Sequence, residues 1–197
     1  AVAVALRAWT DWLERSFNAG EARHGMIAWL IAALAPVAVL AALWGLLAWM
    51  SPFAALLLNI AALYLTLGFR QFSHSFTGIQ SAIRDGDVDR ARELIGAWRG
   101  ESAAHLSREE VIRVAIEEGV VASHRHVFAV LFWFMLLPGP SGAILYRMAA
   151  FLSRRWGGKG EFGRFARRVL FILEWPTARL TAAAFAVVGD FEDAVYC

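Results

Sequence analysis

The sequence predicts an all-α integral membrane protein on three observations: an apolar composition, long runs without charge, and apolar residues at helical spacing between them. The 197 residues are 59% hydrophobic and 18% charged, with a mean hydropathy of +0.51. Soluble domains are about 45–50% apolar and about 25% charged. The net charge of +2 is too close to balance to favour nucleic acid as a partner. The single cysteine, Cys197, excludes a disulfide scaffold and a zinc–thiolate site.

Residues 1–25 predict an amphipathic interfacial helix. Leu6, Trp9, Leu13 and Phe17 recur at helical spacing with charged residues between them, a pattern typical of a helix on a membrane surface. Packing of this helix on the protein's own soluble part is an equal alternative. Because the chain begins at Ala1 rather than Met and stops at Cys197, we expect it to be part of a longer protein. No signal peptide is recognisable in its first residues.

Residues 26–69 predict a transmembrane helical hairpin. The segment 26–50 has 25 residues without a charge, and 52–69 has 18; about 20 apolar residues cross a bilayer. Ser51 and Pro52 mark the turn between the two helices, and Pro36 is a candidate kink.

Residues 70–126 predict a cytoplasmic helical insertion. The segment holds eight Arg and nine Asp+Glu. The sequence 85–87, Asp-Gly-Asp, predicts a turn and helix start, and the sequence 107–110, Ser-Arg-Glu-Glu, is a capping box that opens a second short helix.

Residues 127–168 predict a re-entrant hairpin followed by a basic loop. The run 127–137 has 11 apolar residues, too few to span, before the Pro-Gly-Pro-Ser-Gly sequence at 138–142. Seven cations and one anion follow in 147–168. The positive-inside rule places such a segment in the cytoplasm, which a full crossing at 127–146 would prevent, so we favour re-entry over crossing.

Residues 169–197 predict a broken hydrophobic helix and an acidic end. Glu174 and Arg179 interrupt the apolar run, with Pro176 between them as the predicted break. Charged groups inside such a run are costly in lipid, and they are expected to pair or to face a polar cavity.

Three stretches resemble the CobD/CbiB membrane proteins of cobalamin biosynthesis. Residues 131–134, Leu-Phe-Trp-Phe, and 139–147, Gly-Pro-Ser-Gly-Ala-Ile-Leu-Tyr-Arg, resemble that family's "LFW … G-x-x-G-A-x-x-Y-(K/R)". Residues 173–182, Leu-Glu-Trp-Pro-Thr-Ala-Arg-Leu-Thr-Ala, resemble "L-N-W-x-P-A-R-L-T-A" with the proline one place early. The acidic residue there, and the final stretch, are closer to AmpE, an inner-membrane protein linked to β-lactamase induction.

One departure from the family bears on activity. CobD/CbiB enzymes carry "E-N-T-S-D-G" shortly before the LFW run, where this chain has Glu-Gly-Val-Val-Ala-Ser-His-Arg-His at 118–126. The resemblance therefore implies first an AmpE-like accessory or signalling protein without catalysis of its own. The alternative is an adenosylcobinamide-phosphate synthase, which joins an aminopropanol group to a corrinoid carboxylate with ATP and Mg²⁺. A third reading is a structural subunit of a larger membrane complex.

The candidate site residues are polar groups in or beside the apolar segments. Glu174, Arg179 and Arg147 are expected to bind a polar ligand or guard a cavity; the competing roles are an intramembrane pair for the first two and snorkelling for Arg147. Contact with anionic lipid or phosphate is expected for three further cations: Arg154, Arg155 and Lys159. No catalytic residue, resident cofactor or metal site is expected. The expected location is the bacterial inner membrane, with lipids and a protein partner or second copy as partners.

Overall fold

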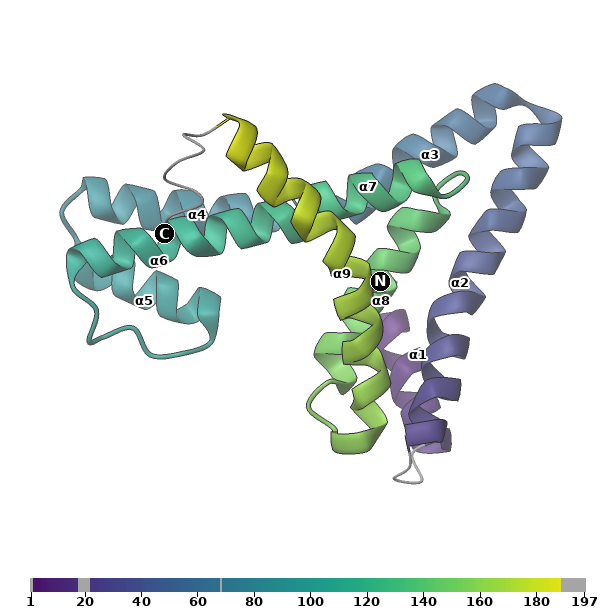
Figure 1. Cartoon of the computed structure of the whole chain (residues 1–197), viewed down its shortest axis with the longest axis horizontal. Coiled ribbons are helices and arrows are strands. Elements are labelled where there is room, and N and C mark those ends of the chain that lie inside the picture. The colour runs from purple at the N-terminus through teal and green to yellow at the C-terminus, as the bar shows by residue number, and fades with distance from the viewer. Residues whose placement is uncertain (1, 18–21, 68, 189–197) are drawn as a thin grey trace. The chain divides into compact units, whose positions relative to one another are not determined.

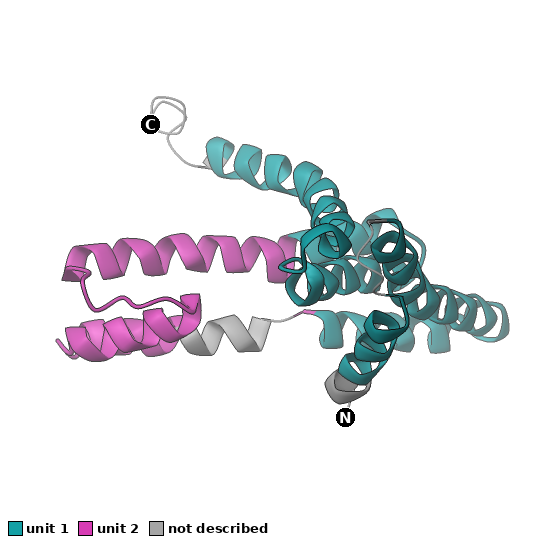
Figure 2. Ribbon diagram, turned by 90° about the horizontal axis from the view of Figure 1, so that it is seen from below, with its two compact units in different colours: residues 1–66, 129–197 teal, residues 67–128 magenta. Residues whose placement is uncertain are grey.

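The computed structural model describes residues 2–17, 22–67 and 69–188, with side chains placed in 6–17, 23–67 and 76–187. Within these ranges every regular element is a helix, which confirms the all-α fold class. The chain divides into two compact units (Figure 2). Unit 1 comprises Ala1–Thr66 and Ala129–Cys197, and unit 2 comprises Leu67–Phe128. The acidic end predicted in 189–197 lies outside the described residues.

Unit 1 contains the predicted hairpin as α2 (Ala22–Met50) and α3 (Pro52–Thr66) (Figure 1). The Ser51 hydroxyl oxygen accepts a hydrogen bond from the Ala54 amide at 3.5 Å, at the start of α3. Large apolar side chains stay exposed along both helices, including Trp49 (86%) and Tyr64 (79%). Contiguous exposure of this kind fits lipid rather than water as the surrounding medium. The helix α2 continues through Pro36. The second helix of the hairpin, α3, has 15 residues, fewer than the 18 predicted.

The core of unit 1 forms where α2 packs against α8 (Ser141–Trp156) and α9 (Gly160–Val188). Small residues allow the helix backbones to approach closely. A Cβ on Gly25 of α2 would lie 2.1 Å from the Phe162 carbonyl oxygen of α9, so no larger residue fits there. Buried Trp156 contacts Phe162 edge-on, with their ring centroids 5.3 Å apart. These contacts hold the α8–α9 pair against α2.

The predicted break at Pro176 is wrong, because α9 is one continuous helix from Gly160 to Val188. Proline removes one backbone donor, and membrane helices tolerate this where neighbouring helices surround them, as α2 and α8 pack on α9 here. The Thr177 hydroxyl donates within this turn to the carbonyl oxygens of Leu173 (3.4 Å) and Glu174 (3.0 Å). Glu174 and Arg179 therefore lie on one helix rather than on two half-helices.

The apolar run after residue 127 also differs from expectation. The helices α6 (Arg108–Ser123), η1 (His124–Phe128, a π-helix) and α7 (Ala129–Leu136) join into one 29-residue helix, Arg108–Leu136. That helix is long and apolar enough to cross a membrane, as are Arg23–Met50 and Gly160–Val187. The chain does turn back after Leu136, and α8 packs on α7. The re-entrant topology stays a prediction, but the argument from an 11-residue segment no longer supports it.

Unit 2 packs three helices where two short ones were predicted: α4 (Phe69–Arg84), α5 (Val88–Arg99) and α6. Ile79, Ile95 and Val111 are fully buried at their centre. The Asp87 carboxylate accepts from the Arg90 amide at 2.9 Å, and α5 ends at Gly100 in the left-handed conformation. The predicted capping box is present: Ser107 and Glu110 exchange side-chain-to-backbone bonds of 3.2 and 2.7 Å. Local sequence signals thus fix both helix starts.

Candidate functional site

A buried polar contact joins α8 and α9 inside apolar unit 1. The Tyr146 hydroxyl donates to the Glu174 Oε1 atom at 3.4 Å. Tyr146 is fully buried and Glu174 is half-buried. A carboxylate at this depth is costly unless hydrogen bonds stabilise it. Its position among apolar helices makes Glu174 a candidate functional group.

Neighbouring polar groups hold this part of α9 in register with α7. The Trp133 indole N–H of α7 donates to the Leu173 carbonyl oxygen at 3.2 Å. Thr177, one turn after Leu173, is also buried. Glu174 is therefore positioned by contacts on both sides along the chain, as a binding or catalytic side chain requires.

Arg179 and Glu174 point in different directions. Five residues on a continuous helix separate two side chains by about 140°. The Arg179 guanidinium lies over the Trp175 ring, 3.8 Å from its centroid, in a cation–π contact. The structure thus gives Arg179 an aromatic partner on its own helix and gives Glu174 the Tyr146 hydroxyl.

Arg147 performs a structural task at the end of the hairpin. Its Nε–H donates to the carbonyl oxygen of Thr66, the last residue of α3. The last carbonyl groups of a helix have no partner within it, and a cation there also complements the helix dipole. Arg147 therefore ties α8 to the C-terminus of α3, and ligand binding or snorkelling stays a prediction for it.

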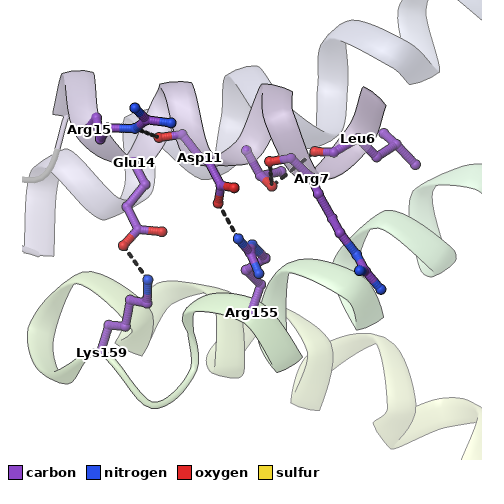
Figure 3. A network of polar contacts seen from close by, with 8 residues as sticks. Leu6, Arg7, Asp11, Glu14, Arg15, Arg155 and Lys159 are labelled. Carbon is purple, nitrogen blue, oxygen red and sulfur yellow. Dashed lines mark hydrogen bonds and ion pairs between the residues drawn. The ribbon is translucent and has the colours of Figure 1, made fainter. Parts of the chain in front are cut away.

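The basic segment at the end of α8 and just after it pairs with α1 (Val2–Phe17) (Figure 3). Arg155 contacts the Asp11 carboxylate, and Lys159 contacts the Glu14 carboxylate. The hydrogen bond from Arg155 lowers the pKa of Asp11 below its usual range. Two of the three cations predicted to meet lipid or phosphate, Arg155 and Lys159, thus form ion pairs within the protein. Arg154, the third, is exposed, and lipid contact stays a prediction for it.

One face of α1 packs on the rest of unit 1, while the location of the helix at a membrane surface stays a prediction. Leu13 and Thr10 are buried, and the Thr10 hydroxyl donates to the Leu6 carbonyl oxygen of its own helix at 2.9 Å. Trp9 and Trp12 stay exposed on the same helix, with their ring centroids 6.1 Å apart. A helix with one packed and one aromatic exposed face remains compatible with a membrane surface on its outer side.

The stretch 118–126, which replaces the family's polar sequence, falls at the end of α6 and in η1. Glu118 forms an ion pair with Arg99 of α5, with 3.5 Å between Oε1 and Nε. His124, Arg125 and His126 occupy the π-helix, a form that is often found at functional sites. Within the described ranges no three His, Cys, Asp or Glu side chains are close enough to hold a metal ion.

Two functional contacts were missed by reasoning from the sequence. Tyr146 stands in the quoted motif, directly before Arg147, but nothing in its spacing points to a carboxylate 28 residues later. Asp11 and Glu14 match the cations of the basic segment in sign, and this charge complementarity was the available signal.

The sequence was compared with known families, curated proteins and solved structures. The family model described as "CobD/Cbib protein" matches residues 2–196. The "Cobalamin biosynthesis protein CobD" of Stutzerimonas stutzeri (strain A1501) is 33% identical over 195 residues, 95% of this chain and 62% of that protein. The protein of the same name from Chromobacterium violaceum is 35% identical over 162 residues, 79% of this chain and 52% of that protein. No solved structure matches.

These relatives overturn the expectation of an AmpE-like accessory protein, because their printed names concern cobalamin biosynthesis. This chain spans between 48% and 62% of the length of the relatives it matches. With a family model matching residues 2–196, this chain is a membrane protein that belongs to the CobD/CbiB family.

Proposed function

We propose that this chain is part of a cobinamide-phosphate synthase of the inner membrane, a multipass enzyme that forms an amide bond in cobalamin biosynthesis. In the proposed reaction an aminopropanol nitrogen attacks a corrinoid carboxyl carbon that ATP has activated. The C–N bond forms while the bond from the carboxyl carbon to the activated oxygen breaks, and the nitrogen gives up a proton. ATP and its Mg²⁺ enter as substrate.

The observation that carries the proposal is family membership across the chain together with the buried Tyr146–Glu174 contact. The reaction needs a base for the proton that the amine loses, and a carboxylate is one of the side chains that can serve as such a base. Glu174 is the proposed proton acceptor, and the Tyr146 hydroxyl orients it. Arg179, exposed on Trp175, is available for an anionic substrate group.

The membrane location supports this assignment of partners. Lipids are the proposed partners of the exposed apolar faces of α2 and α3 and of Arg154 at the end of α8. A second copy or a further protein remains a proposed partner, and nucleic acid is not proposed.

The test is complementation of a cobalamin auxotroph that lacks its CobD/CbiB enzyme, with the full-length gene supplied on a plasmid. Growth without added cobalamin supports the proposal and shows that the altered 118–126 stretch still permits amide synthesis. Absence of growth, with the protein present in the membrane fraction at the level of a complementing CobD control, contradicts it.

A further inference from the structure

The turn between α7 and α8 leaves a buried hydroxyl without a hydrogen-bond partner. Ser141 is the first residue of α8 and is 7% exposed. Its Oγ atom is buried and unpaired within the described part of the chain. A buried polar group without a partner costs about 1–3 kcal/mol, so such a group calls for a ligand, water or ion.

Backbone donors gather at the same point. The first hydrogen bond inside α8 runs from the Ile144 amide to the Pro140 carbonyl oxygen, at 3.2 Å. The N–H groups of Ser141, Gly142 and Ala143 therefore precede the intrahelical ladder. Proline carries no polar side chain, and no side-chain cap bond is formed at Pro140. All three residues are buried, so bulk water does not compensate for the missing cap.

A third donor comes from α2. The Trp44 ring lies against Gly139, where an added Cβ would approach ring carbons Cδ2 and Cε2 to 2.5 and 2.8 Å. Gly139 also has a φ of +61°, which only glycine adopts readily. The indole Nε1–H, bonded to Cε2, is buried and has no partner among the described residues. The Trp44 ring that carries this unpaired donor thus lies on Gly139, two places before Ser141.

The groups at this turn are donors, and they lie at the positive end of a 16-residue helix. Helix N-termini with free backbone N–H groups bind carboxylate and phosphate oxygens. We propose that the N-terminus of α8 binds an oxyanion, carboxylate or phosphate, through the Ser141 hydroxyl, the first N–H groups of α8 and the Trp44 indole N–H.

This inference rests on the proposed function for the identity of the ligand. Tyr146 lies five residues farther along the same helix, a rise of about 7.5 Å, so the donors and the Tyr146–Glu174 contact belong to one helix of unit 1. The oxyanion is then either the corrinoid carboxylate or a phosphate of the nucleotide.

The test is equilibrium dialysis of the full-length protein in detergent with three probes. These are a corrinoid with the free carboxylate, the same corrinoid with that group amidated, and radiolabelled inorganic phosphate. Ser141→Ala is compared with Ser153→Ala, a matched change on the same helix. Trp44→Phe removes the indole donor while keeping a ring on Gly139.

We expect Ser141→Ala to weaken binding of the acid corrinoid or of phosphate about 10-fold or more, with the amidated corrinoid unaffected. Weaker binding of the acid corrinoid would identify the bound oxyanion as the substrate carboxylate. Weaker binding of phosphate would identify it as a phosphate of the nucleotide. Without ligand, the thermal midpoint of Ser141→Ala should equal or exceed that of the unaltered protein, because an unpaired hydroxyl has been removed.

Unchanged anion affinity in Ser141→Ala and Trp44→Phe would overturn the inference. So would a thermal midpoint lowered by Ser141→Ala without ligand, since the hydroxyl then has a protein partner. If complementation fails but phosphate binding still depends on Ser141, the proposed synthase activity is refuted and the proposed anion site is supported.

Discussion

At the scale of single residues, Glu174 is the group on which the proposed chemistry depends. Glu174→Gln keeps the shape of the side chain and removes its ability to accept a proton. We expect the rate of corrinoid amide formation to fall about 100-fold or more. Tyr146→Phe deletes the hydroxyl that contacts the carboxylate at 3.4 Å, and its rate should fall about 10-fold. Initial rates with the purified full-length protein measure both effects.

Phe185→Leu is the matched control, because Phe185 is an exposed apolar residue of the same helix. Its rate should equal that of the unaltered protein. Full activity in Glu174→Gln would remove the carboxylate from the mechanism and reduce the Tyr146 contact to a structural one.

The residue scale also shows where sequence reasoning fails. Glu174 and Arg179 were identified as costly charges in an apolar run, and both lie on the long helix α9. Their partners were not predicted, because one partner lies on α8 and the other depends on the continuity of the helix through Pro176. In a soluble protein, a proline inside a helical pattern predicts that the helix breaks. In a membrane helix packed against other helices, proline is tolerated and the helix continues.

At the scale of elements, the helix starts of unit 2 were predictable because their signals are local. Ser107 and Glu110 are three residues apart, and their reciprocal bonds follow from that spacing.

Ser107→Ala should destabilise unit 2 by about 1 kcal/mol, as for other N-cap losses. Hydrogen exchange of the first turn of α6, in the whole protein, measures it. Ser102→Ala, an exposed change in the preceding loop, should leave that exchange unaltered; equal protection in both variants would refute the cap's contribution.

The docking of α1 on the end of α8 could not be predicted from local sequence patterns, because more than 140 residues separate Asp11 from Arg155. Its stability depends on pH in a defined direction. The pKa of Asp11 is lowered by Arg155, so the pair contributes fully above the usual aspartate pKa of about 3.9. That contribution is lost as the pH falls through the lowered pKa. Salt also weakens such partly exposed pairs.

Spin labels at Ser16→Cys and Gly158→Cys, in a Cys197→Ser background, report this docking. At pH 7 the distance distribution should be narrow. It should broaden below about pH 4, and it should be broad already at pH 7 in Asp11→Asn with Glu14→Gln. Arg7→Gln, on the same helix but outside the two pairs, is the control. A narrow distribution in the double variant would show that Leu13 and the buried face hold α1 alone.

At the scale of the whole molecule, apolar composition and run length predicted a helical membrane protein, because these signals do not depend on long-range contacts. The predicted hairpin 26–69 is present, and Arg23–Met50 is long enough to span. Topology is harder, since it depends on how the polar α6 and the apolar α7 join. The structure joins them through η1 into a single helix of 29 residues, which local apolar runs did not reveal.

The side on which the basic segment lies is the remaining whole-molecule prediction. The seven cations of 147–168 favour the cytoplasm. In a Cys197→Ser background, Gly158→Cys should therefore resist an impermeant thiol reagent in intact cells and react after permeabilisation. Ser51→Cys, in the turn of the α2–α3 hairpin, should react in intact cells and serves as the positive control.

Labelling of Gly158→Cys in intact cells would show that the helix Arg108–Leu136 crosses the membrane and that α8 begins a new segment outside. The pairs of Arg155 and Lys159 with α1 sharpen this test, because they bind the basic segment to residues before the hairpin. A cysteine at Ser16 must then share the behaviour of the one at Gly158. Opposite labelling of the two positions would contradict the docked α1 as well as the cytoplasmic assignment, since paired side chains cannot lie on opposite faces of a bilayer.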